Sequence, residues 1–271
     1  MTINDNESAN GANPSNEAAF FVREHYLDFF SREPDASGLA FWTDQIASCG
    51  TDTVCIDLRR INVSAAFFIS IEFQQTGYLV YRIYKAYGNL PGAPVPVRFN
   101  ELLPDTQQIG RGVVVGQTGW EQVLENNKNA FAADFVSRSR FIAVYPTTLT
   151  PADFVGRFFG NGGVQPTATE RQTIIDEFGG ALNTTDTAAR ARALRRMAEH
   201  PTLAQQEFNK AFVLMQYFGY LRRNPNEAPD ANFDGYNFWL GKLNQFGGNF
   251  VNAEMVKAFI LSGEYRQRFG P

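Results

Sequence analysis

The chain has 271 residues, of which 24 are basic and 28 acidic, and its net charge is −4. Hydrophobic residues make up 44% of the sequence and charged residues 19%, which argues against a disordered or fibrous protein. Because the chain is slightly acidic, we do not expect nucleic acid to be its main partner. Aromatic residues are abundant, with 25 Phe, 10 Tyr and 3 Trp. The length allows one large core or two smaller ones.

The N-terminal residues 1–18 are rich in Asn and Ser and contain no apolar stretch. We therefore expect a polar tail there, and we expect no secretory signal peptide. The longest uncharged apolar run, 63–71, is much shorter than the ~20 residues that span a bilayer. We expect a soluble protein without a membrane span.

Two segments, 21–42 and 212–239, repeat one pattern, and the second carries a six-residue insertion between its Pro and its Gly. Each is followed by a closing motif, AFFISIEF at 66–73 and AFILSGEY at 258–265. This self-similarity predicts repeated structural units. The matched residues are Tyr26 with Tyr217, Arg32 with Arg223, Pro34 with Pro225, Gly38 with Gly235, Phe41 with Phe238, Trp42 with Trp239, Ser70 with Ser262 and Glu72 with Glu264.

Cys49 and Cys55 are the two cysteines of the chain, and turn-forming residues separate them. No other cysteine competes for pairing, and a structural zinc site would need four ligands, so a disulfide is favoured. The alternative, two unpaired thiols, stays open. A disulfide requires an oxidising compartment, so we expect an extracellular or cell-surface location, although no signal peptide is visible.

Two weaker copies lie between the strong ones. The first opens at 78–87 and closes at 133–141, where Arg140 replaces the Glu of the closing motif. The second opens at 154–159 and closes at 205–208. Thr150 followed by Pro151, and the capping box Thr167–Glu170, predict helix starts in this second copy.

The apolar residues of the opening segments recur with helical spacing, while Pro, Gly, Asn and Asp fill the loops. The only candidate strand, 111–116, is short. The sequence therefore predicts an all-α fold with two similar helical domains, each built from two helix–loop–helix pseudo-repeats. We place them at 19–145 and 152–271, joined by a linker at 146–151.

The pattern Y-x-x-(F/Y)-x-x-R-x-P-(D/N), then G-(L/Y)-x-F-W and S-x-E-(F/Y), resembles the bacterial domain-of-unknown-function family 4214, which is similar to the phycobilisome linker domain. The resemblance is strong over 21–77 and 212–270 and loose over 78–207. It implies helical modules of secreted or surface-associated bacterial proteins with an interaction or assembly role. The family has no established catalytic residues, so the resemblance assigns none.

Asp230, Asn232 and Asp234 follow the D-x-N-x-D-G start of a calcium loop. The Glu expected at the twelfth position is missing, because Gly241 stands there. We favour the interpretation that Asp234, and Ser37 in the first copy, cap the Trp-bearing helices. Calcium stays a weaker alternative, and we expect no other cofactor.

Other candidate residues favour structural roles. His25 and His200 lie far apart and have no metal-ligating residue at a suitable spacing. Glu72, Glu207 and Glu264 recur at one repeat position, so we interpret them as structural contacts, with Arg32 and Arg223 as candidate partners, and not as acid–base groups. We expect no enzyme.

These observations predict a self-associating structural protein of a bacterial extracellular or surface assembly, such as a filament, sheath or layer. We expect homo-oligomer contacts through aromatic and Arg-rich surfaces and through the N-terminal tail. Most Phe residues should be core, because they fall at repeat-equivalent helical positions, and the aromatic residues outside the repeats should form the assembly surface. The alternative is a soluble extracellular module that recognises a glycan or a partner protein, with or without calcium.

Overall fold

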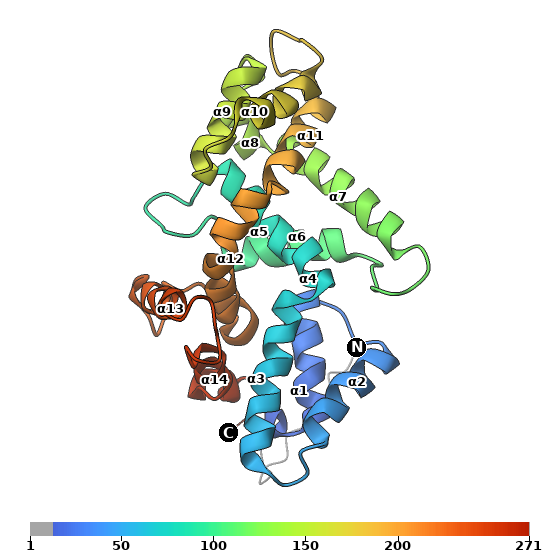
Figure 1. Cartoon of the computed structure of the whole chain (residues 1–271), viewed down its shortest axis with the longest axis vertical. Coiled ribbons are helices and arrows are strands. Elements are labelled where there is room, and N and C mark those ends of the chain that lie inside the picture. Colours follow the sequence, from blue (N-terminus) through green and yellow to red (C-terminus); the bar gives the residue numbers. More distant parts are fainter. Residues whose placement is uncertain (1–12, 271) are drawn as a thin grey trace. The chain divides into compact units, whose positions relative to one another are not determined.

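The structure is a computed structural model that describes residues 13–270. Within this range it consists of helices joined by loops and contains no strand, which confirms the predicted all-α class (Figure 1). Both capped starts are confirmed: Thr150 accepts a hydrogen bond from the Asp153 amide, and Thr167 and Glu170 form a capping box.

The helices form two compact units. Unit 1 contains the residues up to Ser70 and those from Phe212 onward, and unit 2 contains Ile71–Ala211. The two strong copies therefore share unit 1, whereas the two weak copies form unit 2. This division differs from the predicted domains 19–145 and 152–271.

Unit 1 is assembled from the equivalent helices of the first and last copies. The first copy contributes η1 (Pro14–Asn16), α1 (Ala18–His25), the π-helical η2 (Tyr26–Phe30), α2 (Ala36–Ala47) and α3 (Thr53–Ile69). The last copy contributes the end of α12 (Pro201–Met215), the π-helical η4 (Gln216–Leu221), α13 (Asp234–Gln245), α14 (Met255–Ile260) and α15 (Gly263–Gln267).

Counterparts from the two copies meet in the core of unit 1. Helix α3 packs on α14, and η2 packs on η4. Phe29 and Tyr220, which occupy the same repeat position, contact each other with ring centroids 5.5 Å apart. This pairing explains why residues from both ends of the chain form one unit.

The chain ends of unit 1 are joined by side-chain hydrogen bonds. The Asn13 amide donates to the carbonyls of Arg266 and Gly270, at 2.9 and 3.0 Å. The Arg266 guanidinium in turn donates to the Asn16 side chain at 3.0 Å. The segment from Asn13 onward is thus part of the folded unit, which shortens the polar tail predicted over 1–18; residues 1–12 lie outside the described range.

Unit 2 is centred on α5, which is buried along most of its length and packs against α6, α9 and α11. Its elements are α4 (Ile71–Gln75), α5 (Gly77–Tyr87), α6 (Phe99–Gly110), α7 (Trp120–Ser137), α8 (Ser139–Val144), α9 (Pro151–Gly162), α10 (Ala168–Ile175), η3 (Asp176–Phe178), α11 (Thr187–Ala198) and the greater part of α12. Helices on both sides of the predicted linker 146–151 therefore share one core.

A buried arginine joins the two sides of that linker in unit 2. Arg190 is 1% exposed and donates hydrogen bonds to the carbonyls of Tyr145 and Thr184. Its guanidinium lies over the rings of Phe141 and Phe154. Tyr145 is itself fully buried, so this contact lies in the core of unit 2.

Candidate functional site

The signature Tyr and Gly of each strong copy contact each other. A Cβ atom added to Gly38 would lie 2.3 Å from the Tyr26 hydroxyl oxygen, and one on Gly235 would lie 2.7 Å from that of Tyr217. Glycine at these positions lets the buried Tyr reach the backbone of the Trp-bearing helix. The pair is therefore a packing contact within each copy, and it explains why both residue types repeat together.

The signature Trp of each strong copy packs onto the second helix of its own copy. The ring centroids of Trp42 and Phe67 are 6.0 Å apart, and those of Trp239 and Phe259 are 5.7 Å apart. Each of these phenylalanines lies three positions before the matched serine of the closing motif. Trp42 and Trp239 are both half-buried. In both copies this Trp–Phe contact packs the Trp-bearing helix against the helix that leads into the closing motif.

The signature prolines are loop residues in both strong copies. Pro34 lies between η2 and α2, and Pro225 lies in the longer connection between η4 and α13. Pro34 is half-buried, whereas Pro225 is buried. Because proline has a fixed φ and no backbone amide to donate, it suits a connection that leaves one helix and approaches the next.

Both π-helical segments end in a residue with left-handed backbone, Ser31 at φ 55° and Arg222 at φ 56°. The signature arginine follows immediately, and its guanidinium lies over the ring of the signature tyrosine. Arg32 is 5.0 Å from the Tyr26 ring centroid, and Arg223 is 5.5 Å from that of Tyr217. The same reversal of the chain thus positions the same cation–π pair in both copies.

The predicted contact between Arg223 and Glu264 is present. Two guanidinium nitrogens of Arg223 lie 2.5 and 3.0 Å from the Glu264 carboxylate, and one of them is also 2.8 Å from Asp230. Glu72 is buried. Glu207, in unit 2, is buried and accepts hydrogen bonds from Tyr81 and Lys210. Glu207 and Glu264 therefore serve as structural partners of neighbouring side chains.

His25 belongs to the core of unit 1. It is 1% exposed, its Nδ1 is 2.7 Å from the Phe21 carbonyl oxygen, and its Nε2 is 2.8 Å from the Ser64 hydroxyl. Burial lowers the pKa of His25 to about 3, so the ring is neutral at pH 7. Gln216 holds the same place in the last copy and donates to the Phe212 carbonyl at 3.1 Å. Each residue thus hydrogen-bonds to the backbone carbonyl four residues before it in its own copy.

His200 belongs to unit 2. It is buried, and its Nε2 lies 3.5 Å from a Glu170 carboxylate oxygen. The two histidines of the chain therefore lie in different units, each among the side chains of its own core.

The candidate calcium residues are engaged with protein groups. Asp230 pairs with Arg223, while the Asn232 amide nitrogen lies 2.9 Å from the Asp234 carboxylate. Within residues 13–270, no three His, Cys, Asp or Glu side chains gather as a metal site would require. The capping interpretation is wrong for both helices. Helix α2 is capped by Asp35, and not by Ser37, because the Asp35 carboxylate accepts a hydrogen bond from the Gly38 amide. Asp234 is the first residue of α13 and does not cap it, because this helix has no side-chain cap.

Cys49 and Cys55 are joined in the predicted disulfide, with their Cα atoms 5.6 Å apart. The bond connects the turn after α2 to the first turn of α3. Asp52, between the two cysteines, caps α3 by accepting from the amides of Val54 and Cys55. The disulfide and the cap thus act on the same end of the same helix.

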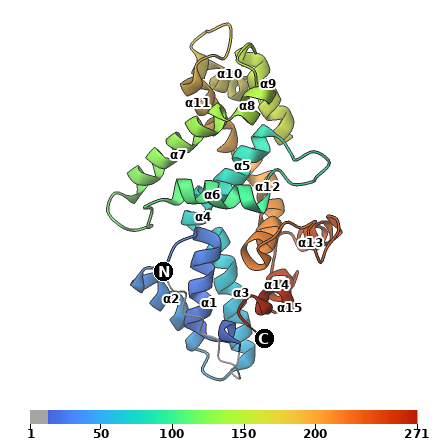
Figure 2. The same cartoon turned by 180° about the vertical axis from the view of Figure 1, so that it is seen from behind.

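One aromatic position is exposed in both strong copies. Phe41 on α2 is 56% exposed and Phe238 on α13 is 60% exposed, and each packs edge-on against the Trp that follows it. Figures 1 and 2 show α2 and α13 at opposite edges of unit 1, with α1 and α3 between them. This position is an exception to the expectation that most Phe residues are core, because the helix turns this side chain outward in both copies.

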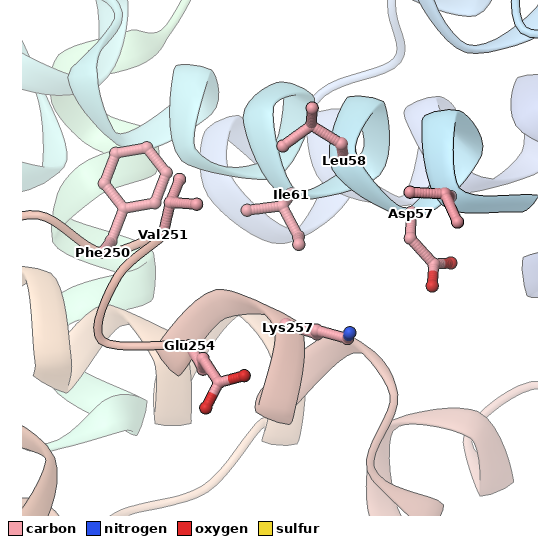
Figure 3. Close-up of a pocket in the computed structure, with 8 residues that line it drawn as sticks. Asp57, Leu58, Ile61, Phe250, Val251, Glu254 and Lys257 are labelled. Atoms are coloured by element: carbon pink, nitrogen blue, oxygen red, sulfur yellow. The ribbon is translucent and has the colours of Figure 1, made fainter.

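A pocket of about 330 Å³ lies between α3 and the segment that leads into α14 (Figure 3). Its lining is mainly apolar, with three charged side chains among the apolar ones. The residues are Val54, Asp57, Leu58 and Ile61 from α3, and Phe250, Val251, Glu254 and Lys257 from the last copy. We call this the α3–α14 groove.

The groove was not predicted from the sequence, although one signal for it exists. Val54, Leu58 and Ile61 recur at helical spacing, yet Val54 is 78% exposed and Leu58 48% exposed. Such a stripe on the first turns of a helix indicates an apolar face that the chain leaves partly open. The opposite wall comes from the last copy and becomes a neighbour only through the packing of α3 on α14.

The described residues form an all-helical protein in which the segments 21–73 and 212–265 carry matching packing contacts. Residues 3–76 match the family model described as Domain of unknown function (DUF4214). This match confirms, for that part of the chain, the family predicted from the sequence. No curated protein and no solved structure matches the chain. Within residues 13–270, no helix is long and apolar enough to cross a membrane.

Proposed function

We propose that the protein is a non-enzymatic structural subunit that associates with copies of itself in a bacterial extracellular or cell-surface assembly, such as a filament, sheath or layer. The observation that carries this proposal is the exposure of Phe41 and Phe238 at the same repeat position of unit 1. Two large aromatic side chains that are exposed to solvent at equivalent sites suit a contact with a partner.

The placement of the two phenylalanines supports propagation of such an assembly. A subunit that extends a filament or layer must contact at least two neighbours, through surfaces that do not close on themselves. Helices α2 and α13, which carry the two exposed phenylalanines, lie at opposite edges of one unit (Figures 1 and 2) and are the two surfaces of the proposal. One repeated scaffold thereby provides two attachment points.

The disulfide supports an oxidising location. The arginines, in contrast, give the proposal less support than we expected. Many of them pair within the chain, for example Arg138 with Asp105, Arg195 with Glu125 and Arg268 with Asp28. The proposal therefore depends on the exposed aromatic residues.

Sedimentation velocity over a wide concentration range tests the proposal. We expect the oxidised protein to form species larger than the monomer as its concentration rises. The double variant Phe41→Ser, Phe238→Ser should associate about ten- to a hundredfold more weakly, because burial of one Phe contributes about 1.5–3 kcal/mol.

The matched control is Leu182→Ser, which removes an 89% exposed apolar residue from unit 2 and should leave association unchanged. A protein that stays monomeric at every concentration would contradict the proposal and favour a recognition module. Association that persists in the double variant would contradict the role given to the two phenylalanines.

A further inference from the structure

The first and last copies also differ where their second helices begin. Counting back from the matched Ser70 and Ser262, Val63 of α3 is equivalent to Met255, the first residue of α14. Both residues are buried, at 2% and 0% exposure. Helix α3 nevertheless begins at Thr53, ten residues before Val63. The first copy thus carries a helical extension, 53–62, that the last copy does not form.

The sequence accounts for this difference between the copies. Gly50 and Gly247 both have left-handed backbone, at φ 57° and 60°, and mark the same point after the Trp-bearing helix. From there the first copy has five more residues than the last before Val63 or Met255. The longer segment of the first copy, 51–62, includes the start of α3 and contains Cys55. The shorter segment of the last copy, 248–254, forms turns and contains no cysteine.

Packing holds the start of α3 weakly. None of the side chains of 53–59 is fully buried, whereas Arg60, Ile61 and most residues beyond them are. The start of a helix also leaves backbone amides without intrahelical partners. The Asp52 cap and the Cys49–Cys55 bond are the features that fix this end.

We propose that the Cys49–Cys55 disulfide is a redox-sensitive latch that keeps residues 53–59 helical and thereby maintains the α3 wall of the α3–α14 groove. Val54, Asp57 and Leu58, three of the four groove residues on α3, lie in this segment. Figure 3 shows Asp57 and Ile61 on α3 with their side chains directed towards the segment that carries Glu254 and Lys257.

The switching reaction is thiol–disulfide exchange. A dithiol transfers two electrons and two protons to the Cys49–Cys55 bond, which breaks to give two cysteine thiols, while the dithiol closes into its own disulfide. In the reduced chain the start of α3 loses its covalent connection to α2. Residues 53–59 then open locally, because few buried contacts oppose opening, and the groove loses that wall.

Hydrogen exchange of the full chain, read by mass spectrometry with and without dithiothreitol, tests this inference. Alkylation of the released thiols verifies that reduction is complete. We expect the amides of 53–59 to exchange about 30-fold faster or more after reduction, the size expected when such a cross-link is lost. Peptides from 63–69, from α14 and from α5 should change by less than about twofold, since they keep their buried contacts.

A Cys49→Ser, Cys55→Ser variant should reproduce the reduced pattern and should not respond to dithiothreitol. If that variant does not fold, the reduced wild-type chain still decides the question. Unchanged exchange of 53–59 in the fully reduced protein would overturn the inference. Faster exchange throughout unit 1 would also overturn it, because the disulfide would then be a general stabilising bond.

Discussion

The first and last copies of the repeat show which residues make the scaffold and which distinguish one copy from the other. Both contain a π-helical segment, a left-handed residue, a stacked Arg–Tyr pair and a Tyr–Gly contact. They differ in their buried polar residue, His25 or Gln216, and in the start of the second helix. The matched residues are thus packing contacts, whereas we expect the differences to change how each copy responds to pH and to reduction.

The largest expected effect concerns the buried polar residue, where only the first copy can titrate. Burial lowers the pKa of His25 from 6.5 to about 3. The unfolded chain therefore binds a proton that the folded chain excludes, and stability falls as the pH drops from about 6.5 towards 3. His25 should cost about 4 kcal/mol of unfolding free energy between pH 7 and pH 3.

His25→Gln gives the first copy the residue of the last and is the matched variant for this prediction. The difference in unfolding free energy between wild type and variant, measured by urea denaturation at several pH values, isolates His25. Asp28, also buried in unit 1, has a raised pKa because of its burial and acts in the opposite direction, but it is present in both proteins. A difference that does not vary with pH would show that His25 is not excluded from protonation.

The next effect concerns the Tyr–Gly contact, which both copies share. Gly38→Ala should destabilise the protein by about 1–3 kcal/mol, because the new methyl group meets the Tyr26 hydroxyl at 2.3 Å. Gly235→Ala should act in the same direction through Tyr217, with a smaller cost at 2.7 Å. Thermal unfolding measures both.

Gly241→Ala is the control for these substitutions. Gly241 lies in α13 with no atom within 4 Å of an added Cβ, so alanine should stabilise the helix by about 0.5–1 kcal/mol. If Gly38→Ala were also stabilising, the close contact would not be a constraint of the fold. Adding Tyr26→Phe should recover part of the loss in Gly38→Ala, because it removes the clashing oxygen.

Much of the scaffold could be predicted from the sequence, because two residues that recur together in both copies indicate a contact that is present in both copies. Helical spacing gave the all-α class, and the recurrence of Glu264 and Arg223 pointed to their ion pair. The composition of unit 1 could not be predicted, since it depends on η2 packing against η4 over a long sequence separation. The exposure of Phe41 was also hidden, because recurrence of a residue does not distinguish a buried position from a surface one.

The smallest expected effect concerns the charged cluster of the last copy. Arg223→Lys keeps the charge but loses the planar geometry that contacts both Glu264 and Asp230. We expect a loss of about 1 kcal/mol, since both carboxylates are partly exposed and water screens them. The loss should shrink in high salt.

Arg59→Lys, at an exposed position of α3, is the control for the charged cluster and should have no measurable effect on stability. Equal losses for Arg223→Lys and Arg59→Lys in urea denaturation would mean that the cluster does not hold the last copy together.

The central claim is that one repeat position supplies two association surfaces, Phe41 and Phe238. Sedimentation velocity of the single variants Phe41→Ser and Phe238→Ser, beside the wild type and the double variant, tests it most directly. We predict that the wild type forms long assemblies, that each single variant forms only short ones, and that the double variant associates about ten- to a hundredfold more weakly than the wild type. Single variants that assemble like the wild type, or a wild type that remains monomeric, would contradict the claim.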